Sequence, residues 1–318
     1  MDPLSAILDS MHASAALALC FRLSAPFAIG KTDVKGIPFR VAEGQPYWLK
    51  VADGEWLRIE PGDLVLLPHG DRHVMASDRS APVVSIGQGF SRLGLQEWVS
   101  PSQEKLDVRT MTFGGEGEVT TIVGGILVFR DFDRSPFLAG LPAVIHISAT
   151  ARPMLANLGA ALKTLLDEAK EAAPGWNIAI CRLAEVIFVQ ALRAHFSGQC
   201  QLARGWYDAL RDPKIGKALL VIHRDLSVDW TVESLATAIG MSRSRFAARF
   251  AELIGQSPMA YQTEVRLSRA AEFLARGDMV SVVAANTGYA SEKAFSRAFR
   301  NWAGDSPGRY RRANAEMN

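Results

Sequence analysis

A segment near the carboxyl end occurs twice, and this internal repeat constrains the fold more than any other feature of the chain. Residues 246–258 have the pattern F-x3-F-x4-G-x-S-P, and residues 295–307 repeat it at a shift of 49 positions. Upstream of each copy an alanine precedes a glycine by four residues, at Gly240 and at Gly288. This pattern fits a helix that is followed by a tight turn at the glycine and by a second helix. The phenylalanine pair would lie on the inner face of that second helix. The repeat therefore predicts two helix-turn-helix units.

A single helix is predicted between the two copies of the repeat. Apolar residues recur at helical spacing over residues 261–276, and Gly277 ends this pattern, as glycine often does at a helix terminus. Ser242 and Ser291 precede the second helix of each copy, where a hydroxyl oxygen would cap the first free N–H groups. The carboxyl third of the chain is therefore expected to be an all-α domain.

Positive charge is concentrated in the same part of the chain. Residues 213–312 hold 15 Lys and Arg against 9 Asp and Glu, a net charge of +6, although the whole chain carries only +2. A basic domain on a mildly acidic body favours a polyanion as partner. On a helical wheel, Lys293, Arg297 and Arg300 lie opposite the phenylalanine pair of the second copy. The residues predicted to contact DNA are Arg243, Ser244, Arg245, Arg249, Glu292, Lys293, Ser296, Arg297 and Arg300.

The two copies differ in what they offer to a duplex. Opposite its phenylalanine pair the first copy has Ser244 and several alanines, so few hydrogen bonds to bases are available there. We expect the second copy to supply the directional base contacts, chiefly through Arg297 and Lys293, and the flanking arginines of the first copy to hold the phosphate backbone. The alternative is that both hairpins pack as an ordinary helical bundle whose arginines only keep the surface soluble.

The order and spacing of these motifs closely resemble the AraC/XylS family of transcriptional regulators. The matching segments are W-T-V-E-S-L-A from Trp230, G-M-S-R-S-R-F from Gly240, G-Q-S-P from Gly255, G-Y from Gly288, F-S-R-A-F from Phe295 and G-D-S-P from Gly304. The resemblance covers about 100 residues. It implies two helix-turn-helix units that enter adjacent major grooves on one face of promoter DNA, joined by a rigid helix. It places the recognition helices at residues 242–253 and 292–302.

The first 150 residues have a different pattern. Short apolar stretches alternate with Gly and Pro, which predicts the strands and turns of a sandwich or barrel. Residues 62–73 follow G-x5-P-x-G-x2-H and resemble the second motif of the cupin superfamily. The fold class is therefore expected to be α+β, with a β-rich cupin-like barrel at residues 1–150. A helical linker at 151–204 and the all-α domain at 205–312 are expected to follow.

The cupin resemblance implies a metal site that this chain has only in part. Cupin enzymes bring a His-x-His pair and a carboxylate to the histidine of the second motif, but residues 38–44 contain no histidine. We therefore expect no cofactor, no metal and no enzyme activity, and a ligand pocket instead. The alternatives are a residual metal site of His69, His73 and a distant residue, or a metal-dependent cupin enzyme fused to a helical domain. The candidate effector-binding residues are Arg40, Tyr47, Trp48, His69 and His73.

Residues 152–200 change to a helical period. Pro174 and Gly175 divide this segment into two predicted helices with apolar stripes, which include Ile180 and Ile187. Such stripes favour a homodimer interface, although packing within one chain would give the same pattern.

The cysteines and the lengths of the apolar runs restrict the compartment. Cys20, Cys181 and Cys200 are odd in number and widely spaced, which indicates a reduced protein without disulfides. No apolar run approaches the roughly 20 residues that span a bilayer, and the N-terminal segment lacks the basic start of a secretion signal. A cytoplasmic protein without membrane contact is expected.

The patterns together predict a transcription factor whose β-rich domain senses a small molecule. Effector binding would shift the population of arrangements toward one DNA-binding geometry. The expected partners are double-stranded promoter DNA, a small-molecule effector, a second copy of the chain and RNA polymerase. A helical protein-interaction module without a DNA role is a third interpretation, and it differs because only binding to DNA should weaken steeply with salt.

Overall fold

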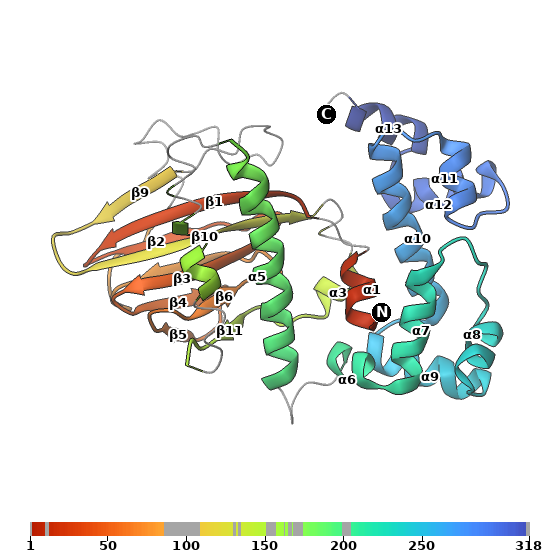
Figure 1. The fold of residues 1–318 in the computed structure, drawn as a ribbon, viewed down its shortest axis with the longest axis horizontal. Helices are drawn as coiled ribbons and strands as arrows, with labels where there is room; N and C mark the ends of the chain where they lie inside the picture. Colours follow the sequence, from red (N-terminus) through yellow and green to blue (C-terminus); the bar gives the residue numbers. More distant parts are fainter. Residues whose placement is uncertain are drawn as a thin grey trace. The chain divides into compact units, whose positions relative to one another are not determined.

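The computed structural model divides the chain into two compact units, which Figure 1 draws and which are described separately below. The β unit comprises residues 13–132 and 142–200, and the helical unit comprises residues 1–12, 133–141 and 201–318. The residues that the structure describes are 2–9, 13–85, 109–129, 132, 135–150, 157–161, 163–164, 167, 174–198 and 205–315. Their strands and helices confirm the α+β class that the sequence predicted.

The described strands of the β unit form two sheets. The larger sheet has the order β11-β6-β3-β10-β1-β9 and the smaller sheet has the order β5-β4-β7-β2-β8. The strands of the larger sheet are β1 (Ala13–Ser24), β3 (Ile37–Gly44), β6 (Leu64–Leu66), β9 (Arg109–Gly114), β10 (Val119–Phe129) and β11 (Ile145–Ile147). The strands of the smaller sheet are β2 (Ala28–Lys31), β4 (Tyr47–Val51), β5 (Trp56–Ile59), β7 (His73–Ala76) and β8 (Val84–Ser85).

The hydrophobic core of the β unit lies between these two sheets. Along β4, Tyr47, Leu49 and Val51 are buried, whereas Trp48 and Lys50 alternate to the other face and are partly exposed. Buried residues from both sheets join them in one apolar cluster. Two sheets that share an apolar interior form a sandwich, which is one of the two architectures that the sequence predicted.

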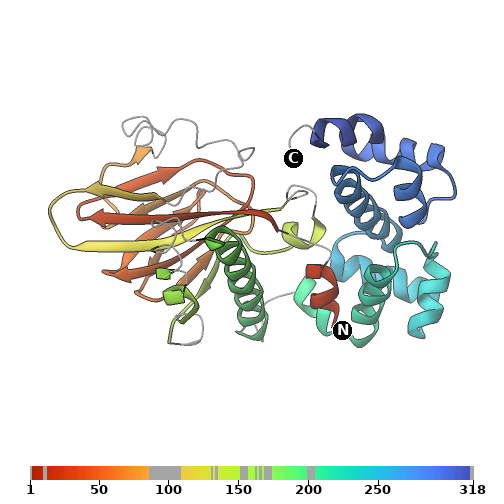
Figure 2. The same ribbon diagram turned by 45° about the horizontal axis from the view of Figure 1, so that its top comes forward.

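The outer face of the larger sheet is covered by α5 (Trp176–Gly198), as Figures 1 and 2 show. Ala184 and Ile187 are buried on its inner side, and the ring centroid of Phe188 lies 5.6 Å from that of Phe129 on β10. The helical period predicted for this segment is therefore confirmed. Much of the helix predicted before it lies outside the described residues.

Helices make up the second unit. They are α1 (Pro3–Asp9), α3 (Pro136–Ala139), α6 (Trp206–Arg211), α7 (Pro213–Arg224), α8 (Val232–Ile239), α9 (Arg243–Ile254), α10 (Pro258–Ala275), α11 (Val280–Asn286), α12 (Glu292–Ala303) and α13 (Pro307–Ala315). The first helix-turn-helix unit is α8 with α9, the second is α11 with α12, and α10 connects them and contacts both. Within the described ranges, no helix combines the length and the apolar character that crossing a membrane requires.

Two short helices from the first half of the sequence belong to the helical unit. α1 packs against α7, where a Cβ added to Gly216 would lie 3.2 Å from Cγ of Pro3. α3 packs through Phe137, whose ring meets that of Trp206 edge-on with centroids 5.3 Å apart. The helical unit therefore includes two short segments from the first 150 residues, because an apolar pattern does not say which core a short helix will join.

Candidate nucleic-acid interface

In the first helix-turn-helix unit, the backbone groups at both ends of α8 have hydrogen-bond partners. Thr231 and Ser234 form a capping box at the start of this helix, and Gly240 ends it in the left-handed conformation with a φ of +66°. Lys214 of α7 donates to the carbonyl oxygen of Ile239 at 2.7 Å and so satisfies part of the last turn. The turn predicted at Gly240 is confirmed.

The second unit repeats this arrangement with one difference at the start of its recognition helix. Gly288 has a φ of +75°, as its place in the turn predicted. The hydroxyl oxygen of Ser291 accepts from the backbone N–H of Ala294 at 3.2 Å and caps α12. Ser242 stands at the equivalent place before α9, but its side chain makes no capping bond. The predicted capping role is therefore confirmed for Ser291 and wrong for Ser242.

The phenylalanine pairs anchor both recognition helices, as their spacing predicted. In α9, Phe246 and Phe250 are fully buried, and their ring centroids lie 5.6 Å apart. In α12, Phe295 and Phe299 are fully buried, and their ring centroids lie 5.5 Å apart. Because residues four apart share one side of a helix, each pair leaves the opposite side of its helix to solvent.

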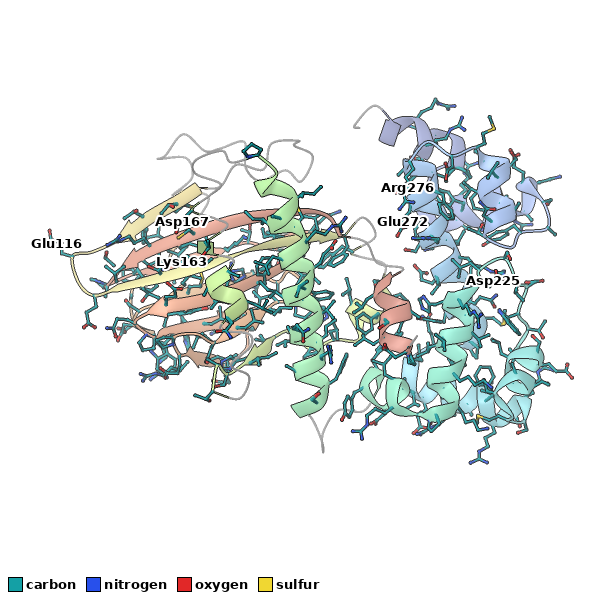
Figure 3. All side chains as sticks on the ribbon, viewed as in Figure 1. Glu116, Lys163, Asp167, Asp225, Glu272 and Arg276 are labelled. Carbon is teal, nitrogen blue, oxygen red and sulfur yellow. The ribbon has the colours of Figure 1, made fainter. Side chains whose placement is uncertain are left out.

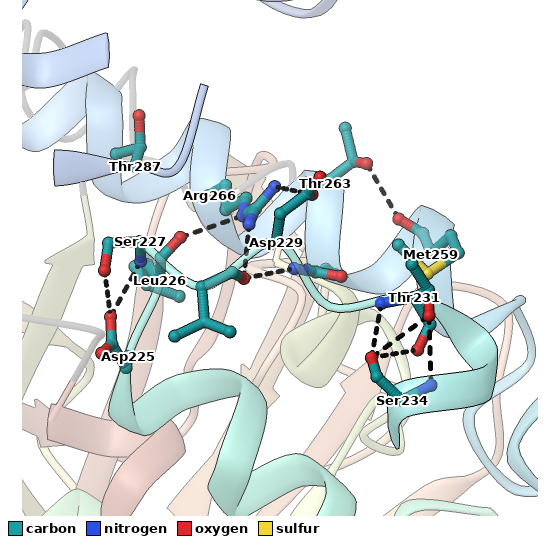
Figure 4. A network of polar contacts seen from close by, with 12 residues as sticks. Asp225, Leu226, Ser227, Asp229, Thr231, Ser234, Met259, Thr263, Arg266 and Thr287 are labelled. Carbon is teal, nitrogen blue, oxygen red and sulfur yellow. Dashed lines mark hydrogen bonds and ion pairs between the residues drawn. The ribbon is translucent and has the colours of Figure 1, made fainter. Parts of the chain in front are cut away.

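Arg266 of α10 holds the loop between α7 and α8, as Figure 4 shows. Arg266 is only 7% exposed, and it donates from Nε to the carbonyl oxygen of Leu226 at 3.0 Å and from Nη2 to that of Val228 at 2.6 Å. Its Nη1 lies 3.4 Å from Oδ1 of Asp229. The guanidinium group therefore fixes the loop of the first unit against the connecting helix.

The same loop touches the turn of the second unit at Gly288. A Cβ added to Gly288 would lie 2.6 Å from Nη2 of Arg266 and 2.7 Å from the carbonyl oxygens of Leu226 and Ser227. Asp225 shapes the loop by accepting from the backbone N–H of Ser227 at 3.0 Å and from its hydroxyl at 2.6 Å (Figure 4). Glycine is therefore required at this turn for the close approach of the loop as well as for the positive φ.

The connecting helix α10 also binds the second recognition helix. Trp302 of α12 donates from Nε1 to Oε1 of Glu264 on α10 at 2.7 Å. Farther along α10, Arg269 pairs with Glu272, which Figure 3 labels. One helix thus contacts the loop of the first unit and the recognition helix of the second, so α9 and α12 hold a defined relation within the helical unit.

Most of the residues predicted to contact DNA lie on the free sides of α9 and α12. Those that are exposed are Arg243, Ser244, Arg245, Glu292, Lys293, Arg297 and Arg300, and Ser296 is half-buried. With the residues that the structure describes, the five cationic side chains among them form no ion pair or hydrogen bond. Their charge is therefore available to a polyanion.

Arg249 has a different environment from the other predicted contacts. Its Nε lies 3.2 Å from Oδ2 of Asp212, and its Nη1 lies 3.0 Å from Oε2 of Glu252. Asp212 also caps α7 by accepting from the backbone N–H groups of Lys214 and Ile215. The guanidinium of Arg249 therefore ties α9 to the start of α7 through Nε and Nη1.

Three of the five candidate effector residues lie inside the β sandwich. Arg40 on β3, Tyr47 on β4 and His73 on β7 are each at most 4% exposed. Burial raises the pKa of Tyr47 to about 12, although Arg40 opposes that shift, so the phenol is neutral. The structure thus brings together a guanidinium, a phenol and an imidazole away from water.

The other two candidate residues lie elsewhere in the β unit. Trp48 is on the outer face of β4, where the guanidinium carbon of Arg79 lies 4.6 Å from its ring centroid. His69 lies in a turn, where its Nδ1 is 3.9 Å from Oδ2 of Asp71. Neither side chain shares the interior with Arg40.

The surroundings of His73 do not suit a metal ion. Its Nδ1 lies 2.8 Å from the carbonyl oxygen of Asp71, and its Nε2 is buried without a partner. Burial, together with repulsion from Arg40 and Lys31, holds the pKa of His73 well below its usual value. A metal cation would meet the same repulsion. In the part of the chain that the structure describes, no three His, Cys, Asp or Glu side chains gather as a metal site.

Two further charged contacts of the β unit were not predicted from the sequence. Lys31 ends β2 directly opposite His73 on β7, and burial together with repulsion from Arg40 lowers its pKa to about 7. His146 lies with Nε2 2.7 Å from Oδ2 of Asp63 and so joins β11 to the turn before β6. One sequence signal could have identified Lys31. It lies two residues after the buried Ile29, on the same face of the short strand β2.

Comparisons with known proteins agree with both units. Residues 2–197 match the model of a family described as Cupin, and residues 235–313 match that of a helix-turn-helix domain. The chain is 27% identical to the transcriptional regulator AlkR of Acinetobacter baylyi over 98% of its own length and 99% of that protein. It is 34% identical to a protein of Streptomyces antibioticus described as an AraC-like transcription regulator, over 62% of this chain and 65% of that one, so it spans just under two thirds of that relative.

A solved structure is similar to part of the chain. It is a DNA-binding transcriptional dual regulator of Escherichia coli K-12, with 26% identity, a TM-score of 0.31, and coverage of 36% of this chain and 97% of that one. The paired helix-turn-helix units, the β sandwich and these family matches agree with one another. The chain therefore belongs to the family of AraC-type transcriptional regulators in which a cupin domain precedes the helix-turn-helix domain.

Proposed function

We propose that this regulator reads a specific duplex sequence through both recognition helices and that a small molecule bound in the β unit controls it. The strongest support is the position of Arg266, which ties the loop of the first unit to α10 beside Gly288 of the second. A fixed pair of recognition helices suits two successive major-groove segments, which lie roughly 34 Å apart on one face of DNA. Two hairpins that only fill a helical bundle would not need this buried guanidinium.

The two recognition helices are proposed to make different contacts with DNA, α12 with the bases and α9 with the phosphates. Lys293 and Arg297 on the free side of α12 would donate to base edges, since long cationic side chains reach guanine acceptors in the major groove. Arg243 and Arg245 in the first turn of α9 would bind phosphates. Arg249 is proposed to position α9 rather than to touch DNA, because its Nε and Nη1 already pair with two carboxylates.

A selection of bound sequences from a random pool of duplexes, with the full-length protein, tests this function. Arg297→Ala should relax the sequence preference, whereas Arg245→Ala should weaken binding to all sequences alike and reduce the salt slope by about one. Arg276→Ala, an exposed arginine at the end of α10, is the matched control and should change neither quantity. Failure of the wild-type protein to enrich any sequence would refute the proposal.

A homodimer through α5 is proposed on a separate observation. Ile178 is 68% exposed and Val186 is 44% exposed on this helix, although its opposite side is buried against the larger sheet. Ile178 and Val186 lie on the same exposed side of the helix, on either side of Arg182, which pairs with Glu185. A second copy that presents the same side would cover both apolar side chains. Val186→Glu should sediment as a monomer where the wild type and the control Arg193→Ala sediment as dimers. A dimeric Val186→Glu variant would contradict this interface.

The effector is proposed to act by changing the population of DNA-binding arrangements. A ligand can shift such an equilibrium only by its difference in affinity for the two arrangements. Binding of the effector should therefore change the affinity for DNA, and DNA should change the affinity for the effector by the same factor. Contact with RNA polymerase and a cytoplasmic location stay predictions from the sequence.

A further inference from the structure

Among the residues that the structure describes, a guanidinium group in the interior of the β sandwich has no counter-ion. Arg40 lies two residues before Ala42 on β3, so both side chains are on the same face of the strand. Ala42 belongs to the apolar core, and the side chain of Arg40 therefore points between the sheets. Gly124 lies opposite Arg40 on β10, and a Cβ there would stand 3.0 Å from Cα of Arg40. Nη1 of Arg40 is buried, and no residue in the described ranges gives it a hydrogen-bond partner. Since a buried unpaired charge is costly, this group calls for an anion.

Two further nitrogen-bearing side chains face the same interior from the smaller sheet, one buried (His73) and one half-buried at the end of its strand (Lys31). Lys31 on β2 and His73 on β7 are direct partners in the antiparallel ladder, which places both side chains on one face. Each feels the charge of Arg40. The cluster therefore combines groups from β2, β3 and β7 around one place in the interior.

No carboxylate among the described residues pairs with any of these three groups. The buried acid Asp63 is already used, because its Oδ2 lies 2.7 Å from Nε2 of His146 and its Oδ1 accepts from the N–H of Ala149 at 3.0 Å. Tyr47 is the other titratable neighbour, and it is a neutral phenol. The cluster is thus left with excess positive charge that the described part of the chain does not balance.

We propose that Arg40, Lys31 and His73 form a binding site for the carboxylate group of a small organic acid. This inference rests on the proposed function, because it assigns a chemical class to the effector of the β unit. The planar guanidinium fork matches a carboxylate in geometry, and the apolar side chains around the cluster suit an apolar remainder of the ligand.

The charge of the cluster favours one negative charge over two. Arg40 stays charged near neutral pH, because burial lowers the pKa of its guanidinium only to about 10. Lys31, with a pKa of about 7, is partly charged, and His73, whose pKa is held well below its usual value, is neutral. A monoanion such as a carboxylate therefore balances the cluster better than a phosphate dianion.

Binding of the anion should be coupled to uptake of protons. A nearby negative charge favours the protonated forms of Lys31 and His73 and so raises both pKa values. Arg40 opposes this rise, while Tyr47 stays neutral and Asp63 stays paired with His146. The affinity for a carboxylate should therefore fall as the pH rises above about 7.

Thermal unfolding of the full-length protein in acetate, benzoate or octanoate tests the site. Sodium chloride keeps the ionic strength constant, and acetamide, benzamide and octanamide serve as uncharged counterparts. We expect the carboxylates, and not the amides, to raise the unfolding midpoint of the β unit. Arg40→Met should abolish this rise, whereas Lys50→Met should keep it, since Lys50 lies on the outer face of β4.

Calorimetric titration with octanoate gives a second readout. In two buffers of different ionisation enthalpy, the wild-type protein should take up protons as octanoate binds near neutral pH. Lys31→Met should take up fewer protons and bind at least about tenfold more weakly, a loss of about 1.4 kcal/mol. Unchanged affinity and proton uptake in Lys31→Met would remove Lys31 from the site and overturn the proposal.

The outcomes separate a binding role of Arg40 from a structural one. Without carboxylate, Arg40→Met should unfold at the wild-type midpoint or above it, because the substitution removes an unpaired buried charge. A much lower midpoint, or failure to fold, would make Arg40 structural and overturn the proposal. So would an equal rise with sodium phosphate, or no rise with any of the three carboxylates. Sequence-selective DNA binding in the same samples would show that the regulator function stands although the carboxylate site has failed.

Discussion

Gly288→Ala tests whether the two helix-turn-helix units are locked to each other. The substitution places a methyl group 2.7 Å from the carbonyl oxygens of Leu226 and Ser227 and 2.6 Å from Nη2 of Arg266. A side-chain tip could move away cheaply, but two backbone carbonyls cannot move without displacing the loop. The loop would then lose at least one hydrogen bond to Arg266. The effect should therefore reach the first unit although the substitution lies in the second.

The expected magnitude follows from two contributions. A left-handed φ costs a non-glycine residue about 1–2 kcal/mol, and loss of a hydrogen bond to a charged group costs about 1.5–3 kcal/mol. Gly288→Ala should therefore cost about 2.5–5 kcal/mol of local stability. Gly304→Ala is the matched control, because Gly304 has a φ of +83° and no atom within 4 Å of the added Cβ. It should cost only the first contribution.

Hydrogen exchange of the full-length protein measures this difference. Gly288→Ala should speed exchange in α12 at least tenfold more than Gly304→Ala does, since about 1.4 kcal/mol corresponds to a factor of ten. It should also speed exchange in residues 226–232 of the first unit, where Gly304→Ala should have no effect. If both variants speed exchange equally and only near the substituted residue, the two units are not coupled through this contact.

Three further predictions concern the helical unit. Arg249→Ala should destabilise the helical unit by about 1 kcal/mol, because it removes the ion pairs of Arg249 with two carboxylates. The same substitution should leave the salt dependence of DNA binding unchanged. A salt slope reduced by about one would mean that Arg249 binds a phosphate. Thr231→Ala should cost about 1 kcal/mol of stability, because it removes the N-terminal cap of α8. Hydrogen exchange in the first turn of α8 should become faster, and unaltered exchange would argue against the cap. Burial lowers the pKa of His223 from 6.5 to about 4, so on acidification the unfolded chain binds a proton at this residue before the folded chain does. The free energy of unfolding should therefore fall by about 3 kcal/mol as the pH is lowered from 6.5 to about 4. His223→Gln should flatten that fall in calorimetry, and identical pH profiles would exclude His223 as its cause.

The repeat could be predicted because each of its parts is local in sequence. A phenylalanine pair four residues apart defines the inner side of a helix, and a glycine at the turn indicates a positive φ, so α8, α9, α11 and α12 follow from short windows. The role of Arg266 could not be predicted in this way. It binds backbone carbonyls 40 and 38 residues upstream, at Leu226 and Val228, and any residue type supplies a carbonyl.

The site in the β unit was predicted only in part, because strand register decides it. Tyr47 and Trp48 are neighbours of similar size, and alternation sends one to the interior and the other to the surface. Arg40 and His73 were identified by their places in the cupin motifs. Lys31 lies outside those motifs, and its contribution depends on β2 pairing with β7 in the register that brings it opposite His73.

The chain uses unpaired cations in two ways that salt should distinguish. Arg243, Lys293 and Arg297 are exposed, so water solvates them at little cost. A duplex bound to them as proposed would gain affinity largely by releasing counter-ions. Arg40 is 4% exposed, so water and salt reach it poorly, and its missing partner costs the free protein stability. An anion that enters would recover that cost, and mobile ions would screen the interaction little. Carboxylate binding should therefore depend weakly on salt, while DNA binding by the same protein should fall steeply. A carboxylate affinity that fell with salt as steeply as the DNA affinity would place the anion on the surface, away from Arg40.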